Sequence, residues 1–345
     1  MNLKDEPVIK QIAKELGLGR YRNAEEAIRE YCIKKVIELL KSFEHVDDLS
    51  KFLEIVSSGL GVKFEHIEDD TELEVLIKKY TSKGELAFVD LPNQLDDKTD
   101  AVLIRLSKQQ QWKYVAIIDC RGSKKYKAYF SKWHEIAHVL TMSPQAVFQF
   151  RRTPTIKKDP EEQMVDRVAG DLAFYSPLFM PELLTRVKID KRLSFDNIEV
   201  LRKKICPDSS REATIRAAVY RSPFPQVLII ARYALKKQDE RLISSDQTNL
   251  FQTDHDVLSS LKLRAVEVTG NNDAKKVGLC IHRNMEVPLE SIITKVFDTA
   301  PPNASAIQTE NLSWWKHSRG QLEYMPILVE AMKIGQRVFA LIKKI

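Results

Sequence analysis

The spacing of apolar residues predicts that the chain begins with helices. Apolar positions recur at helical intervals through Ile28 and Val36, after Asn23 as a capping residue. A second helix is expected from Asp47–Asp48 and should end at Gly59-Leu60-Gly61, where glycine permits the left-handed conformation that commonly ends helices.

Strand and helix patterns alternate after residue 61. Runs of β-branched and apolar residues predict strands at 62–67, 101–106 and 114–119, and an acidic helix at 72–80. Helices are expected at 130–142 and at 161–175, the second stopping near Pro177 and Pro181. The mixture predicts an α+β fold.

The second half of the chain has weaker patterns. They predict helices at 195–205 and 209–220, strands at 263–269 and 276–282, and an amphipathic helix at 325–345. We therefore expect four segments: an N-terminal helical extension (1–46), a central α+β domain (47–185), a basic helical segment (186–241) and a mixed α/β domain (242–345).

Composition narrows the class of protein. With 345 residues, of which 43% are hydrophobic and 30% charged, the chain can build packed cores and is not disordered. Its four cysteines are isolated, which argues against a cysteine zinc cluster and favours a reducing compartment. The first ten residues lack the apolar core of a signal peptide, and no apolar run is long enough for a membrane span. We expect a soluble cytoplasmic protein.

One motif decides the functional interpretation, His134-Glu135-Ile136-Ala137-His138. On a helix both imidazoles lie on one face and can bind a single metal ion, with Glu135 beside it as a proton acceptor. With 7 His and 48 acidic residues available, chance would produce this pattern about 0.02 times. Apolar neighbours predict a buried helix, where unpaired imidazoles are costly. Zinc is therefore favoured over another divalent ion and over two structural histidines.

A catalytic zinc site needs three protein ligands and an open position. Glu162, at the start of helix 161–175, is the expected third ligand, with Glu161 as the alternative. Asp166 follows one turn later on the same face and can accept a hydrogen bond from a ligating histidine. The two glutamates could instead only complement the helix dipole, but this would not account for Asp166 on an otherwise apolar face.

The order of these residues resembles the ImmA/IrrE family of metallopeptidases. That family has H-E-x-x-H, then E-x-x-A-N/D-x-F-A, and then L-L-M-P. The chain matches with its 134–138 motif, with Glu162-x-x-Val165-Asp166-x-Val168-Ala169, and with Leu178-Phe179-Met180-Pro181. It departs from the family at Val165 and Val168 and in the lead-in Tyr129-Phe130-Ser131-Lys132-Trp133.

The resemblance covers residues 47–185 and implies a compact zincin-like domain. By position, it implies zinc bound by His134, His138 and Glu162, with Glu135 as the catalytic base. It also implies a protein substrate with a regulatory role, a helix-turn-helix repressor or an antitoxin. In one branch of the family the last domain is sensor-like, and only this analogy suggests such a role for residues 242–345.

The same residues predict a hydrolytic mechanism. Zinc lowers the pKa of a bound water to about 7, Glu135 removes its proton, and the hydroxide attacks a peptide carbonyl. Tyr175 and His255 are both candidates for stabilising the resulting oxyanion. The strand at 101–106 is a candidate for pairing with an extended substrate.

The positive charge is concentrated after the catalytic domain. Residues 186–241 carry 14 Lys/Arg and 7 acidic residues, so their net charge is +7 against +6 for the whole chain. The helices at 195–205 and 209–220 resemble a helix-turn-helix with Arg211 and Arg216 on the second helix, which makes DNA a candidate partner. A solvated helical pair is the alternative for this segment. For the whole chain the alternatives are a DNA-binding regulator with a structural or vestigial metal site, and a toxin-like component activated by a partner.

Overall fold

The computed structural model describes residues 3, 6–43, 45–107, 111–142, 150–152, 159–190, 192–236, 260–317 and 320–345. The chain divides into two compact units, Met1–Pro181 with Arg202–Arg211, and Glu182–Leu201 with Glu212–Ile345. Each contains helices and strands, in agreement with an α+β fold class. The predicted boundaries at residues 46 and 185 stay predictions, and the one at 241 lies outside the described residues.

Capping side chains fix the starts of several helices in the first unit. Asn23, Asp48 and Asp69 each accept a hydrogen bond from a backbone N–H of the first turn, as the sequence predicts for Asn23. The helices are α1 (Pro7–Glu15), α2 (Ala24–Leu40), α3 (Leu49–Leu60), α4 (Asp70–Thr81), α5 (Leu91–Gln94), α6 (Ala128–Thr141) and α7 (Pro160–Ala173), with 3₁₀ turns η2 (Leu86–Asp90) and η3 (Gly122–Lys127).

The first unit has a four-stranded sheet in the order β1-β3-β2-β4. Its strands are β1 (Val62–Ile67), β2 (Ala101–Arg105), β3 (Tyr114–Asp119) and β4 (Phe150–Arg152), and the first three confirm the predicted strands. β1 and β3 are parallel, whereas β2 is antiparallel to both of its neighbours. Because β4 pairs with Ala101–Leu103, this part of β2 has both edges occupied, so the prediction that it pairs with a substrate is wrong there.

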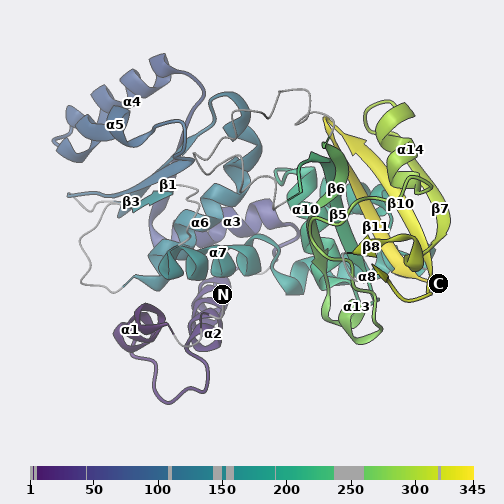
Figure 1. Ribbon diagram of the computed structural model, residues 1–345. Coiled ribbons are helices and arrows are strands. Elements are labelled where there is room, and N and C mark those ends of the chain that lie inside the picture. Colours follow the sequence, from purple (N-terminus) through teal and green to yellow (C-terminus); the bar gives the residue numbers. More distant parts are fainter. Residues whose placement is uncertain are drawn as a thin grey trace. The chain divides into compact units, whose positions relative to one another are not determined.

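Helices cover both faces of this sheet. α4 and α5 lie on one face, and α3 and α6 lie on the other (Figure 1). Gly61 connects α3 to β1 with a φ of +69°, in the left-handed region that the predicted helix end requires. The ring of Phe52 on α3 lies 5.1 Å from that of Trp133 on α6 and 4.7 Å from that of Tyr175. These aromatic contacts fix α6 against α3.

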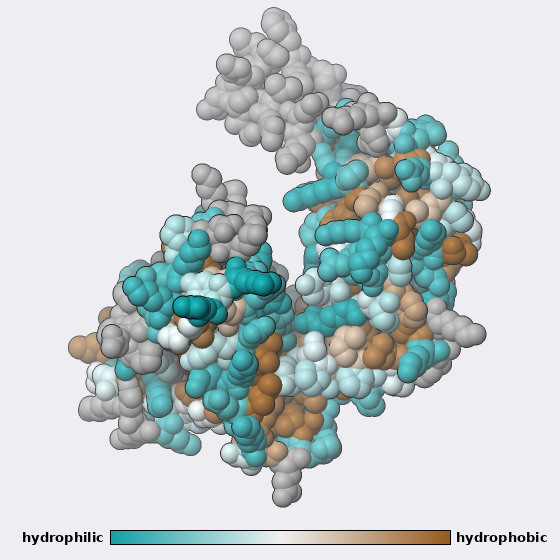
Figure 2. Space-filling model, turned by 90° about the horizontal axis from the view of Figure 1, so that it is seen from below, coloured by the Kyte–Doolittle hydropathy of each residue, from teal (hydrophilic) through white to brown (hydrophobic). Residues whose placement is uncertain are grey.

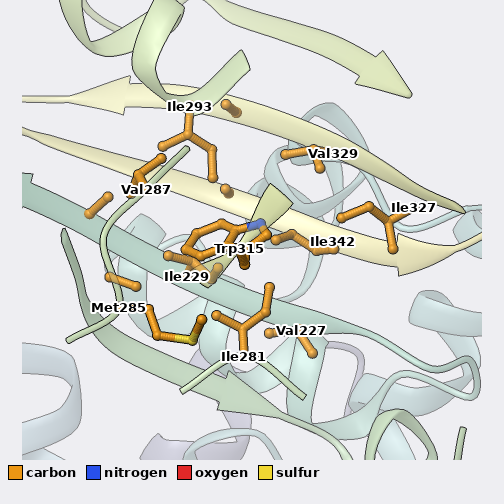
Figure 3. Packing of buried hydrophobic residues seen from close by; sticks show 14 of the residues in the cluster. Val227, Ile229, Ile281, Met285, Val287, Ile293, Trp315, Ile327, Val329 and Ile342 are labelled. Atoms are coloured by element: carbon orange, nitrogen blue, oxygen red, sulfur yellow. The ribbon is translucent and has the colours of Figure 1, made fainter. Parts of the chain in front are cut away.

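The second unit is built on a five-stranded antiparallel sheet in the order β6-β5-β11-β10-β7. Trp315 is fully buried among residues such as Ile229, Met285 and Ile342 (Figure 3). The main strands are β5 (Val227–Ala234), β6 (Lys262–Gly270), β7 (Ser305–Asn311), β10 (Pro326–Ile334) and β11 (Arg337–Lys344). The short elements are α13 (Asn272–Lys276), α14 (Ile292–Thr299), η4 (Leu312–Trp314), β8 (Lys316–His317) and β9 (Gly320–Gln321).

The predicted helix at 325–345 is wrong. This segment is the hairpin of β10 and β11, joined at Gly335, whose φ is +60°. Val338 to Ile342 are all buried, so the strand is covered on both faces and lacks the alternation of a half-exposed strand. Periodicity alone cannot distinguish such a run from a buried helix.

One further strand prediction fails at a glycine. The predicted strand at 276–282 is instead the end of α13 and an irregular segment, because Asn271 caps α13 and Gly278 adopts a φ of +75°. The predicted helix at 161–175 is α7, and it ends at Ala173 before Pro177 as expected. A separate helix that was not predicted, α8 (Ser176–Asp190), follows and contains both prolines. Pro177 lies in the first turn of α8, where the N–H that proline lacks has no helical acceptor.

The surface is mixed in polarity. The face shown in Figure 2 carries mainly hydrophilic residues interrupted by smaller hydrophobic areas, as folded proteins commonly do. Within the described part of the chain, no helix combines the length and the apolar character needed to cross a membrane.

Candidate metal centre

Both histidines of the motif lie on α6, one turn apart and facing the interior of the first unit. Each is only 1% exposed, and Trp133, Ile136 and Ala137 around them are fully buried. The helix ends when Met142 turns to an extended conformation. The local sequence therefore forms the buried helix that the sequence predicts, with two imidazoles on one face.

Helix α7 brings the carboxylate to these imidazoles. Asp159 caps the helix, and Pro160 begins it, so Glu162 stands in the first turn. Its Oε2 lies 3.2 Å from Nε2 of His134, and its Oε1 lies 3.4 Å from Nε2 of His138. The two Nε2 atoms are 3.1 Å apart. The predicted triad thus comes together in space from two helices that pack on each other.

Asp166 lies on the other side of the His134 ring. Its Oδ1 is 3.1 Å from Nδ1 of His134. When Nδ1–H donates to this carboxylate, neutral His134 keeps a lone pair on Nε2, the atom that faces Glu162 and His138. This is the arrangement that the sequence predicts for a carboxylate behind a ligating histidine.

The donor set fits a metal cation. Ligands at about 2.0–2.1 Å from a tetrahedral zinc ion are separated from one another by about 3.3 Å, close to the 3.1–3.4 Å found here. Lone pairs and a carboxylate that converge at this distance repel one another unless a metal ion or a proton lies between them. Within the described residues, His134, His138 and Glu162 form a group of donors that could hold a metal ion.

Glu135 is placed between the two ligand positions in sequence and is fully buried. The neighbouring Glu162 and Asp166 are 28% and 24% exposed, so the site reaches the surface on the α7 side. Glu161, the alternative ligand, is not in the donor group. Burial, followed by the charges of Asp159 and Glu162, raises the pKa of the Glu161 carboxyl.

Tyr175 and His255 are the two residues predicted to stabilise the oxyanion. Tyr175 stacks on Phe52, and burial raises the pKa of its hydroxyl. It lines a cavity of about 500 Å³ whose other described walls come from α2, from Asp171 and from the start of α8. His255 lies outside the described residues, so both roles stay predictions.

The helices of the predicted helix-turn-helix are present as α9 (Phe195–Ile205) and α10 (Arg211–Arg221). Arg216 has a structural contact: its Nη2 lies 2.8 Å from Glu212 and 2.6 Å from Glu267 on β6. Arg337 on β11 also pairs with Glu212, at 2.8 Å. Arg216 therefore links α10 to the sheet of the second unit, and DNA contact by this segment stays a prediction.

One set of contacts on α7, the helix that carries Glu162, was not predicted from the sequence. Glu25 and Arg29 on α2 form ion pairs with Arg167 and Asp171 on α7. On each helix the two charged residues are four positions apart, and this spacing can be read from the sequence. Their pairing across 142 residues cannot be read from it.

Comparison with known proteins adds no family assignment, since no family model and no curated protein matches the chain. The functional interpretation therefore depends on the chemistry of the triad and on the motif resemblance.

Proposed function

We propose that this protein is a zinc-dependent endopeptidase with a zincin-like catalytic domain. The observation that carries the proposal is the convergence of His134, His138 and Glu162 at 3.1–3.4 Å, with buried Glu135 on the same helix as the two histidines. The resemblance to the ImmA/IrrE family supports the same residue roles. Zinc is favoured because two imidazoles and one carboxylate leave one tetrahedral position open, as catalytic zinc sites require.

Asp166 and Glu135 would have different roles in the hydrolysis of the peptide bond. When bound, zinc would supply Lewis-acid activation of water and of the peptide carbonyl. Asp166 keeps the His134 ring in the tautomer and orientation that direct Nε2 to the ion. Glu135 accepts a proton from the attacking water and passes it to the amine released when the C–N bond breaks. The buried helix α6 holds Glu135 in place and excludes bulk water from it.

The substrate class follows from the resemblance rather than from the geometry. We propose a regulatory protein of the repressor or antitoxin type, cleaved at a peptide bond. Capturing bound proteins from the host with the Glu135→Gln variant, and then mapping by mass spectrometry the cut sites that the wild-type protein makes in them, would name the substrate.

The decisive experiment separates zinc binding from proteolysis. Glu135→Gln should retain one zinc per chain, measured by atomic emission after dialysis, and should lose at least about 1,000-fold in peptide cleavage. Glu54→Gln, at an exposed acid on α3, is the matched control and should keep full activity. If Glu135→Gln keeps the whole cellular effect of the protein, the peptidase proposal is wrong. That result would favour the alternative, a DNA-binding regulator with a structural or vestigial metal site.

A further inference from the structure

Two helices of the first unit, α2 and α7, are joined by ion pairs among four charged residues, two on each helix. Arg29 on α2 makes a bidentate pair with Asp171 on α7, with Nε–Oδ2 and Nη2–Oδ1 distances of 2.6 and 2.9 Å. One turn earlier on both helices, Glu25 contacts Arg167, and Glu25 also lies 3.7 Å from Arg29. We refer to Glu25, Arg29, Arg167 and Asp171 as the interhelical clamp.

The clamp and the metal ligand occupy different sides of α7. At 100° per residue, Arg167 and Asp171 lie about 140° around the helix from Glu162 and Asp166. α7 is therefore held from two directions, by α2 at the clamp and by α6 at the donor triad.

The clamp is buried on one side and exposed on the other, since the side chains of Arg29, Asp171 and Arg167 are 30%, 20% and 38% exposed. Ala24, Ile28 and Cys32 on α2 are buried, and the Glu25 side chain is only 9% exposed. Burial, assisted by the charge of Asp171, raises the pKa of the Cys32 thiol to about 12. The bidentate geometry makes the partly buried Arg29–Asp171 pair more specific in its orientation than a single-contact ion pair at the surface.

Rotation of α7 would move Glu162 directly. A ligand must stay within about 0.5 Å and 10–20° of its productive geometry, and nothing covalent fixes the angle of a helix about its axis. Two ion pairs on adjacent turns of the two helices resist that rotation.

We infer that the interhelical clamp positions the α7 carboxylates for metal binding, so that helix α2 of the N-terminal extension is part of the scaffold of the metal site. The inference depends on the proposed function only in requiring a metal at the triad. The clamp residues act through α7 and do not touch the ion, so they are positioning residues.

The test uses the full chain and Zn²⁺ alone, with affinity measured by competition with a chromophoric chelator. Arg29→Glu and Asp171→Arg should each weaken zinc binding by about tenfold. The double variant places two acids on α2 opposite two bases on α7, so it should recover most of the lost affinity. Lys34→Glu, the same charge change at an exposed position of α2, should bind zinc like the wild type.

Several measurements keep the outcomes distinct. Far-UV circular dichroism shows whether each variant is folded, and Asp171→Asn replaces Asp171→Arg if the reversed charge prevents folding. Folded single variants with wild-type zinc affinity, or a double variant no better than the single ones, would overturn the inference. Absence of zinc binding by the wild type would instead refute the proposed function.

Discussion

Oδ1 of Asp166 lies 3.1 Å from Nδ1 of His134, on the opposite side of the imidazole from the nitrogen that faces Glu162. The ring thus lies between two carboxylates that stand one turn apart on α7: Asp166 accepts from Nδ1–H, and Glu162 faces the lone pair of Nε2. Such a contact fixes the tautomer and raises the basicity of the metal-directed nitrogen. In the proposed metal site, Asp166 would orient a ligand without being one itself.

Asp166→Asn should therefore weaken zinc binding without changing its stoichiometry. The amide can still accept from Nδ1–H but no longer carries the charge, so we expect a loss of about 10- to 100-fold in affinity. Chelator competition measures the affinity, and metal analysis at saturating zinc should still give one ion per chain. A variant that saturates at less than one ion would indicate that Asp166 is itself a ligand.

Glu162 and Glu161 offer a matched comparison of adjacent acids. Glu162→Gln should bind zinc at least about 100-fold more weakly, because a neutral amide oxygen is a poor ligand for this ion. Glu161→Gln should retain wild-type affinity, since only its neighbour joins the donor group. Both variants lose one acidic residue from the first turn of α7, so any effect on the helix dipole is common to them. Equal losses would contradict the assignment of Glu162.

The site could be predicted from the sequence because its geometry is local. His134 and His138 are one helical turn apart, as are Glu162 and Asp166, so each helix alone fixes two of the groups. The Arg29–Asp171 pair joins positions 142 residues apart, and no local rule states which helix α2 will meet. In the fold, helices with a capping residue and the strands β1, β2 and β3 could be predicted from the sequence. The strands β10 and β11 could not, because both of their faces are buried and their apolar residues do not alternate with polar ones.

A substitution at Gly335 tests whether residues 325–345 form the β10–β11 hairpin or the helix that the sequence predicts. In the hairpin its φ is +60°, and a Cβ built on it meets no atom within 4 Å, so alanine would add backbone strain but no clash. Gly335→Ala should therefore lower the free energy of unfolding by about 1–2 kcal/mol. In a helix the same change would raise it by about 1 kcal/mol. Urea unfolding followed by circular dichroism distinguishes the two signs.

Glu65 on β1 is surrounded by donors. Its Oε1 lies 2.8 Å from Nζ of Lys79, 2.7 Å from the hydroxyl of Tyr80 and 2.9 Å from Nζ of Lys63. Burial alone would raise the pKa of the Glu65 carboxyl, but these hydrogen bonds outweigh it and lower the pKa to about 2. The side chain is 17% exposed, so screening by solvent is limited.

The lowered pKa predicts how the stability of the first unit depends on pH. The pKa is lower in the folded than in the unfolded chain, so Glu65 stabilises the fold above pH 5, and this contribution is lost as the pH falls from about 4.5 to about 2. Glu65→Gln should cost about 2 kcal/mol at pH 7, measured by urea unfolding, and half of that or less at pH 3. Glu74→Gln, at an exposed acid of α4, is the control and should cost little at either pH. A Glu65→Gln effect that is the same at both values would show that the ion-paired carboxylate is not the source of the stability.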